Sequence, residues 1–235
     1  MVLSRADSRA LTVLPVHDKE GIRLSTMGSR AWLAETTGAF DLHAQRRIWS
    51  LARALSHYDD VESLIPGVTN LLVLLRTTPA DPDAIEYRLH QLWQQAQAVE
   101  AQGKLIDIPV CYGGEHACDL EAVCRHTGFS AQEVVRRHYQ GAYTVCALGS
   151  APGFGYLHGL DPLLATPRKQ VPSLHMLKGT VTIGGPQAGV SVLTGPNGWN
   201  AIGYAEITVF DPWADSPALM APGDRVRFVP ERIEL

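Results

Sequence analysis

From about Ala142 to its end, the chain is divided into short apolar segments by glycine and proline, and this pattern restricts the fold more than any other feature. Turn-forming groups stand at Gly184-Gly-Pro186, Pro196-Asn-Gly198 and Pro222-Gly-Asp224. Between such turns lie runs rich in β-branched residues, which favour strands. The expected strands are residues 143–148, 180–183, 190–194, 205–210 and 225–229. Many short strands with this punctuation predict an antiparallel barrel or sandwich.

The first hundred residues have a different texture, in which strands alternate with amphipathic helices. The expected strands are residues 29–35, 61–65, 70–76 and 105–111, and the expected helices are residues 41–58 and 84–102. Asp41 is a suitable N-cap for the first helix, and Pro82 suits the start of the second. The order strand, helix, strand, strand, helix, strand is that of a ferredoxin-like domain, with an unspecified α+β layer as the alternative.

Composition and charge restrict the class of protein. The 235 residues carry a formal charge of −4, and 46% of them are hydrophobic, which is ordinary for a globular protein with a real core. A mildly acidic chain without a basic stripe is a poor candidate for nucleic-acid binding. The longest apolar run, residues 71–75, is far too short to span a membrane, and the N-terminus lacks a signal peptide, so we expect a cytoplasmic protein.

Several motifs occur in a fixed order along the chain. Ile108-Pro-Val-Cys-Tyr-Gly-Gly-Glu-His116 is followed by Ala151-Pro-Gly-Phe154 and by Gly159-Leu-Asp-Pro162. Further matches are Pro167-Arg-Lys169, Gly189, Gly198-Trp199, Ile202-Gly203, Phe210-Asp-Pro212 and Pro222-Gly-Asp224. Together they resemble the family that holds the B-type subunit of 5-oxoprolinase, allophanate hydrolase subunit 1 and a sporulation kinase inhibitor. The resemblance runs from about Leu14 to Pro230.

This resemblance implies a fold and a mode of action. The implied fold class is α+β, with a ferredoxin-like N-terminal domain in residues 1–104 and a cyclophilin-like antiparallel β-barrel in residues 105–235. Members of the family typically act with a larger homologous partner, the C-type subunit of 5-oxoprolinase or an allophanate hydrolase subunit 2-like protein, and with a separate A-type subunit. Such a complex opens 5-oxoproline to glutamate and uses ATP as a co-substrate, while this chain alone is expected to bind no cofactor.

The same motifs supply candidate site residues. Glu115 and His116 follow two glycines, and we expect them to act as an acid/base pair or to form an interdomain hydrogen bond. Phe154 and Tyr156 are expected to wall a pocket, unless they are buried in a rigid loop. Arg168 suits an anionic group of the substrate, and Lys169 is the weaker candidate. The remaining substrate-binding candidates are Gln187, Trp199 and Asn200, with a position in the core as the alternative for Trp199.

Metal binding and nucleophilic catalysis have weaker support. Cys111, His116, Cys118, Cys124 and His126 lie close together, but their irregular spacing does not match a zinc site, so no metal is expected. The four cysteines are expected to be reduced. No GxSxG nucleophile elbow and no GxxxxGK[ST] phosphate loop occurs in the sequence.

The sequence therefore predicts one subunit of a hydrolase that acts on an amide or lactam bond, and this chain is expected to be inactive alone. Two alternatives remain: a protein that acts in the same way on a urea derivative such as allophanate, and a non-catalytic inhibitor of a histidine kinase. Ser150, His158 and Asn197 differ from the residues usual in the family, which suggests that the substrate or the partner differs from that of the well-known oxoprolinase.

Overall fold

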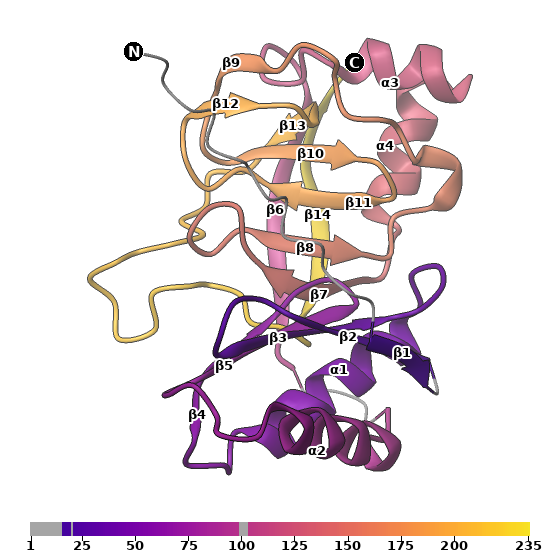
Figure 1. Ribbon diagram of the computed structural model, residues 1–235. Helices are drawn as coiled ribbons and strands as arrows, with labels where there is room; N and C mark the ends of the chain where they lie inside the picture. The colour runs from indigo at the N-terminus through magenta and orange to yellow at the C-terminus, as the bar shows by residue number, and fades with distance from the viewer. Residues whose placement is uncertain (1–15, 20, 99–102) are drawn as a thin grey trace, which may run out of the picture. The chain divides into compact units, whose positions relative to one another are not determined.

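The computed structural model describes residues 16–19, 21–98 and 103–235. The chain divides into two compact units, Met1–Val99 and Glu100–Leu235, and Figure 1 shows their elements. No helix in the described ranges is long and apolar enough to cross a membrane.

The first unit is a five-stranded sheet with two helices. Its strands pair antiparallel in the order β1-β2-β3-β5-β4. They are β1 (Val16–Lys19), β2 (Ile22–Thr26), β3 (Ala31–Thr36), β4 (Val61–Pro66) and β5 (Asn70–Leu75). The helices are α1 (Leu42–Leu55) and α2 (Pro82–Gln95). Alternate residues of β5, Leu71, Val73 and Leu75, are buried in one core with apolar residues of both helices, because side chains of a strand alternate between its faces.

Local chemistry explains where the helices begin. The Asp41 carboxylate accepts hydrogen bonds from the backbone N–H groups of His43 and Ala44, which confirms it as the N-cap of α1. Pro82 occupies the first turn of α2, where its missing N–H leaves no hydrogen bond unmade. The helix α2 ends at Gln95, and Ala96 is already extended, so the predicted extension to residue 102 is wrong for residues 96–98. Residues 99–102 lie outside the described ranges.

The strand order of this sheet differs from the predicted ferredoxin-like order. The last strand of that order, residues 105–111, belongs to the second unit, where it forms part of β6 (Leu105–Gly113). Its expected place beside β3 is taken by β2, which pairs antiparallel with β3 from Ile22↔Thr36 to Thr26↔Trp32. The expectation was wrong here because local periodicity shows that a segment is extended but not which strand it pairs with.

The second unit is built around a closed barrel with the strand order β10-β11-β8-β7-β14-β6-β13. Besides β6, its strands are β7 (Tyr143–Leu148), β8 (Gly155–His158), β10 (Thr180–Gly184), β11 (Gln187–Val190), β13 (Asn200–Tyr204) and β14 (Arg225–Glu234). The long strands β6 and β14 run parallel to each other, from Leu105↔Arg225 to Gly113↔Glu234. The barrel is therefore mixed, and the prediction of a purely antiparallel barrel is wrong for this pair.

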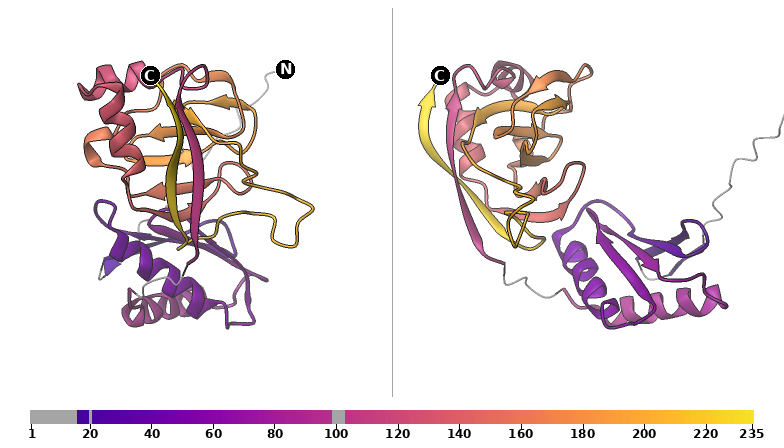
Figure 2. Two further views of the ribbon diagram at one scale, coloured as in Figure 1. Left: turned by 180° about the vertical axis from the view of Figure 1, so that it is seen from behind. Right: turned by 90° about the vertical axis from the view of Figure 1, so that its left-hand side faces the viewer.

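Smaller elements complete this unit. They are α3 (Leu120–Thr127), α4 (Ala131–Tyr139), the 3-10 turn η1 (Pro162–Leu164) and the two-stranded sheet of β9 (Ser173–Met176) and β12 (Gly195–Asn197). The two helices lie beside the barrel, as the turned views in Figure 2 show. The Ser130 side chain accepts a hydrogen bond from the Glu133 N–H, as its N-cap position predicts. Asp119 stands at the N-cap position of α3, where its residue type predicts a capping bond, but its side chain makes none there.

Two predicted strands are not strands. β11 ends at Val190, so residues 191–194 are irregular, and residues 205–209 belong to a long loop between β13 and β14. Val209 in that loop is nevertheless buried in the barrel core, and Ile207 packs against it. The apolar residues in the segment 205–210 are therefore explained by this burial and not by strand pairing. Conversely, residues 151–178, where no strand was predicted, contain β8, η1 and β9.

Candidate functional site

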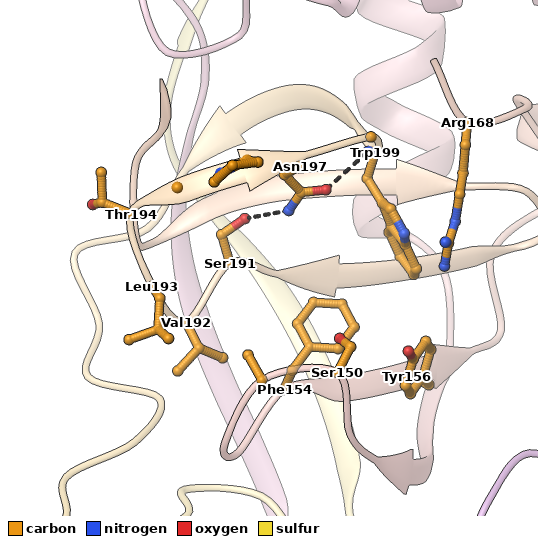
Figure 3. Close-up of a pocket in the computed structure, with 14 residues that line it drawn as sticks. Ser150, Phe154, Tyr156, Arg168, Ser191, Val192, Leu193, Thr194, Asn197 and Trp199 are labelled. Atoms are coloured by element: carbon orange, nitrogen blue, oxygen red, sulfur yellow. Dashed lines mark hydrogen bonds between the residues drawn. The ribbon is translucent and has the colours of Figure 1, made fainter. Parts of the chain in front are cut away.

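An open cavity of about 450 Å³ lies in the barrel unit and is the candidate site. Figure 3 shows its lining side chains. Its walls come from the turn before β8, from the segment before β9 and from the loop that joins β11 to β13. The lining residues are Ser150, Ala151, Phe154, Tyr156, Arg168, Ser191, Val192, Leu193, Thr194, Gly195, Pro196, Asn197, Gly198 and Trp199.

Three aromatic rings and one guanidinium form one wall of the cavity. The Phe154 ring stands edge-on to Tyr156 and to Trp199, with ring centroids 5.1 Å and 5.4 Å away. The Arg168 guanidinium carbon lies 5.4 Å from the centroid of the Trp199 ring, within the range of a cation–π contact. Phe154 and Trp199 are nearly buried, whereas Arg168 is exposed. In Figure 3 the Arg168 and Trp199 side chains extend side by side toward Phe154 and Tyr156.

The turn that carries Phe154 is rigid. The Gly149 N–H donates to the Phe154 carbonyl, and the Phe154 N–H donates to the Ala151 carbonyl. Ser150 has a positive φ of 59°, a conformation that costs a non-glycine residue free energy and is found disproportionately at binding sites. The aromatic wall is thus held by its backbone before any ligand arrives.

Hydrogen bonds also fix the opposite, polar wall. The Asn197 side chain donates to the Ser191 hydroxyl over 3.2 Å and accepts from the Trp199 N–H over 2.9 Å. These bonds join the loop that follows β11 to the backbone of Trp199. The sequence marks Ser150 only as a departure from the family pattern and gives no signal for Ser191, because no local pattern marks a serine as pocket-facing.

Three predicted substrate-binding residues lie outside the lining of this cavity. The Lys169 ammonium bonds the Asp119 carboxylate and the Ser173 hydroxyl, each over 2.6 Å. The buried Asn200 amide donates to the carbonyls of Pro167 and Ile183. Gln187 begins β11 in the tight connection from β10. The structure therefore gives Lys169 and Asn200 a role in holding the segments that form the cavity.

Glu115 and His116 line a second pocket of about 260 Å³, together with Cys118, Ser173, His175, Met176, Leu177, Thr180 and Ala201. The His116 Nε2 lies 3.5 Å from a Glu115 carboxylate oxygen, and the Glu115 side chain is 87% exposed. The His116 ring packs on Tyr204 with centroids 4.8 Å apart. Neither residue lines the larger cavity, so the structure does not bring the predicted acid/base pair to the predicted aromatic wall.

The four cysteines are the remaining candidates for a metal or nucleophilic site. Within residues 16–19, 21–98 and 103–235, no group of three or more His, Cys, Asp or Glu side chains is arranged to hold a metal ion. None of the four cysteines, all of which lie in the described residues, forms a disulfide bond. Burial raises the pKa of the Cys146 thiol to about 12, so this thiol is protonated at neutral pH.

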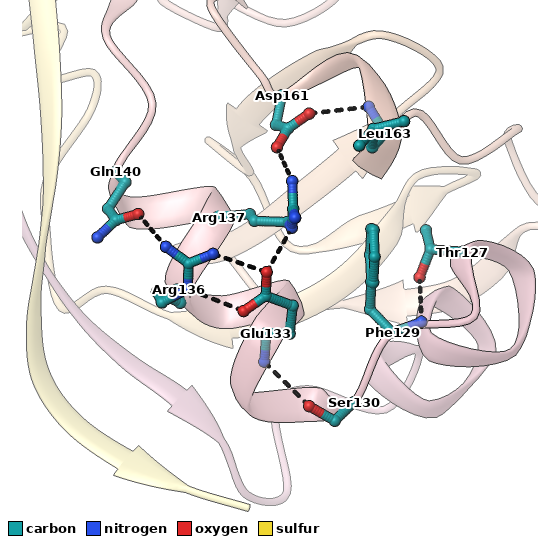
Figure 4. A network of polar contacts seen from close by, with 9 residues as sticks. All are labelled: Thr127, Phe129, Ser130, Glu133, Arg136, Arg137, Gln140, Asp161 and Leu163. Carbon is teal, nitrogen blue, oxygen red and sulfur yellow. Dashed lines mark hydrogen bonds and ion pairs between the residues drawn. The ribbon is translucent and has the colours of Figure 1, made fainter.

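A charged network fixes another motif, the turn at Gly159-Leu-Asp-Pro162, to α4. Arg137 donates to Asp161 over 2.6 Å and to Glu133 over 2.7 Å, and Arg136 donates to both oxygens of Glu133, as Figure 4 shows. The hydrogen bonds from Arg136 lower the pKa of the Glu133 carboxyl to about 2, with Arg137 contributing. These groups satisfy one another, which explains the motif by structure rather than by ligand binding.

Most of the chain matches a known class of domain. Residues 22–220 match the family model described as the carboxyltransferase domain, subdomain C and D, and the chain belongs to this family.

Two similar proteins are named as subunits of 5-oxoprolinase. The chain is 43% identical over 211 residues to the B-type subunit of 5-oxoprolinase from Escherichia coli O157:H7, an alignment that covers 89% of this chain and 96% of the relative. It is 37% identical over 194 residues to the B-type 5-oxoprolinase subunit from Haemophilus influenzae, covering 83% of this chain and 91% of that protein.

Solved structures show the same fold. A Pyrococcus horikoshii protein, PH0987, matches with a TM-score of 0.54 and 34% identity, over 89% of this chain and 97% of that chain. The protein TTHA0988 matches with a TM-score of 0.70 and 32% identity over 86% of this chain, but the match spans only 39% of that longer chain. The Kluyveromyces lactis urea carboxylase, at 20% identity and a TM-score of 0.72, shares the fold over 97% of this chain and 23% of its own length.

Proposed function

We propose that this chain is part of a 5-oxoprolinase-type complex that hydrolyses a small cyclic amide, and that the 450 Å³ cavity receives the amide. The observation that carries the proposal is the position of the Arg168 guanidinium over Trp199, next to the rings of Phe154 and Tyr156. The 43% identity to a relative named as a 5-oxoprolinase subunit supports the same conclusion.

The wall suits such a ligand chemically. 5-Oxoproline is a small flat lactam that carries one carboxylate. A guanidinium binds a carboxylate through two parallel hydrogen bonds. The faces and edges of Phe154 and Trp199 offer an apolar surface to the ring, and the half-buried Tyr156 adds a hydroxyl for a carbonyl or amide group.

We propose further that the chain is inactive alone. Its sequence carries neither a nucleophile elbow nor a phosphate-binding loop. In our proposal, the larger homologous partner closes the cavity, and ATP is bound and consumed in the complex that also contains the A-type subunit. The match to only 39% of TTHA0988 supports this, because the same fold there is part of a chain more than twice as long.

Reconstitution tests the proposal. This chain, its larger homologous partner and the A-type subunit are combined, and ATP-dependent formation of glutamate from 5-oxoproline is measured. Arg168→Met is expected to raise KM by about 10- to 100-fold, because a hydrogen bond to a charged group contributes about 1.5–3 kcal/mol. Arg125→Met is the matched control, because Arg125 is a 66% exposed arginine on α3 that pairs only locally with Glu121.

The outcomes separate the alternatives. If the three proteins together form no glutamate, the oxoprolinase assignment is wrong, and turnover of allophanate in the same assay would replace it. If Arg168→Met and Arg125→Met behave alike, the cavity is not the substrate site. His116→Gln tests the predicted acid/base role from the second pocket: loss of kcat without a change in KM would support it.

The proposal also covers the fold type of each unit, the domain boundary and the cellular compartment. We propose that the barrel is of the cyclophilin-like type and that the first unit is a ferredoxin-like variant in which β2 replaces the final strand. We place the domain boundary between residues 104 and 105, where β6 begins. The cytoplasm is the proposed compartment of the complex.

A further inference from the structure

Trp213 is the most exposed large hydrophobic residue in the described ranges, at 93% of its full accessible surface. It stands on the long loop between β13 and β14, which extends away from the rest of the barrel unit in Figure 1 and in the left view of Figure 2. An indole that is this exposed contributes almost nothing to the packing of its own unit. Tryptophan is also one of the residue types enriched among the anchors of protein interfaces.

Backbone pairing and hydrogen bonds give the loop that carries Trp213 a defined conformation. An isolated β-bridge joins Phe210 to Ala218, and the Asp211 N–H donates to the Pro217 carbonyl over 2.8 Å. The Asp211 carboxylate accepts a hydrogen bond from the Trp213 N–H over 3.0 Å, which fixes the turn at the tip. A preorganised tip lowers the conformational entropy that docking must remove.

The base of the same loop is continuous with the candidate site. Val209 and Met220, at the two ends of the loop, are buried in the barrel core. Gly153 lies so close to Phe210 that a Cβ added at Gly153 would meet the Phe210 Cβ at 3.1 Å. The turn that carries Phe154 therefore packs on the base of the loop that carries Trp213, so a partner held by this loop would also lie beside the cavity.

The chemistry of the tip indicates what it docks into. Trp213 has the exposed carboxylates Asp211 and Asp215 two residues away on either side. An apolar anchor with an acidic rim fits an apolar pocket rimmed by lysine or arginine. The match to 39% of TTHA0988 and to 23% of the urea carboxylase shows that this fold occurs joined to further polypeptide. The family description names only subdomains C and D of the carboxyltransferase domain.

We propose that Trp213 anchors this chain to its larger homologous partner, by inserting into an apolar pocket with a basic rim on that protein. The inference rests on the proposed function, because it names the surface through which the partner reaches the cavity. Since Trp213 touches almost nothing within its own unit, its removal should change binding and leave folding unaffected.

The test measures the affinity of the full chain for the purified larger partner. Trp213→Ala is expected to weaken binding by about 30-fold or more, as an interface anchor does. Trp213→Phe should retain binding within about 10-fold of wild type, because it keeps an aromatic anchor. Val171→Ala is the matched control, because Val171 is 81% exposed in the same unit and is expected to leave binding unchanged. Asp215→Asn should slow association and flatten its dependence on salt.

Fluorescence gives a second readout that a purely structural role would not move. Binding of the larger partner should shift the tryptophan emission of the wild-type chain to shorter wavelength, and Trp213→Phe should lack that part of the shift. The inference would be overturned if Trp213→Ala bound the partner within threefold of wild type, or if the wild-type and Trp213→Phe chains showed equal shifts in emission. The oxoprolinase assignment would stand in either case. A self-association that Trp213→Ala abolishes would assign the surface to a second copy and overturn the inference too. If the wild-type proteins neither associate nor form glutamate, both proposals fail.

Discussion

Lowering the pH from 7 to 5 is expected to destabilise the barrel unit through His138. This side chain is fully buried on α4. Its Nδ1 lies 2.8 Å from the Tyr112 hydroxyl, and no residue in the described ranges forms a hydrogen bond with its Nε2. The groups packed on the ring are Tyr112 of β6, Tyr143 of β7 and Phe228 of β14, none of which carries a negative charge at these pH values. Burial alone lowers the pKa of His138 to about 3.

The sign and magnitude follow from proton linkage. The unfolded chain binds a proton at His138 below a pKa of about 6.5, whereas the folded chain does so only near 3. The unfolded state therefore binds more protons throughout this window, and stability is complete above pH 6.5 and falls as the pH falls toward 3. Between pH 7 and pH 5 this linkage lowers the free energy of unfolding by about 2 kcal/mol.

The assay compares the free energy of unfolding of the wild-type chain and of His138→Asn at pH 7 and pH 5. Urea unfolding is followed by the exchange protection of amides in β6 and β14, which reports on the barrel unit alone. Asparagine keeps a polar atom near the Tyr112 hydroxyl but cannot titrate, so the variant should lose about 2 kcal/mol less on acidification. His175→Asn, at an exposed histidine of β9, is the control and should behave as wild type. Parallel pH profiles for wild type and His138→Asn would refute the reasoning.

Three further substitutions test the support of the cavity. Lys169→Met should lower the free energy of unfolding by about 2 kcal/mol, because it leaves the half-buried Asp119 carboxylate without its cation; a loss below about 0.5 kcal/mol in urea unfolding would show that the pair is solvated. Gly189→Ala should cost about 1–3 kcal/mol and weaken substrate binding, because the new methyl group would meet the Phe154 ring at 2.8 Å; an unchanged KM would contradict this. Asn200→Ala should cost about 2 kcal/mol, since two carbonyls lose their donor; thermal unfolding at the wild-type temperature would argue against it.

The sequence predicted best what local periodicity encodes. Asp41 and Pro82 marked helix starts correctly, and the apolar run in residues 70–76 matched β5. Pairing between distant segments left no such local signal. The parallel pairing of β6 with β14 joins Leu105 to Arg225, far apart in the chain, and β2 entered the sheet at a place where another strand was expected.

In the candidate site, some residues were predicted correctly from the sequence and others were not. Phe154, Tyr156, Arg168 and Trp199 were predicted from the motifs that carry them, and the structure brings all four to one cavity. Their neighbours Lys169 and Asn200 were predicted for the same site but lie outside it. The Lys169 side chain instead bonds Asp119 and Ser173, and the Asn200 side chain bonds backbone carbonyls, although each residue is adjacent to a lining residue. Sequence adjacency alone cannot say whether such a side chain faces the cavity or a neighbouring segment.

The residues outside the cavity explain why Arg168 is well placed. The Lys169 N–H donates to the Gly198 carbonyl over 2.7 Å, and the Asn200 amide donates to the Pro167 carbonyl over 2.9 Å. The backbone on both sides of Arg168 is thus tied to the segment that carries Trp199. A substrate carboxylate that binds the guanidinium therefore restricts side-chain torsions but not the backbone. Lys169→Met should accordingly weaken substrate binding through the mobility of Arg168, with a smaller rise in KM than Arg168→Met. An equal or larger rise would place the lysine itself on the substrate.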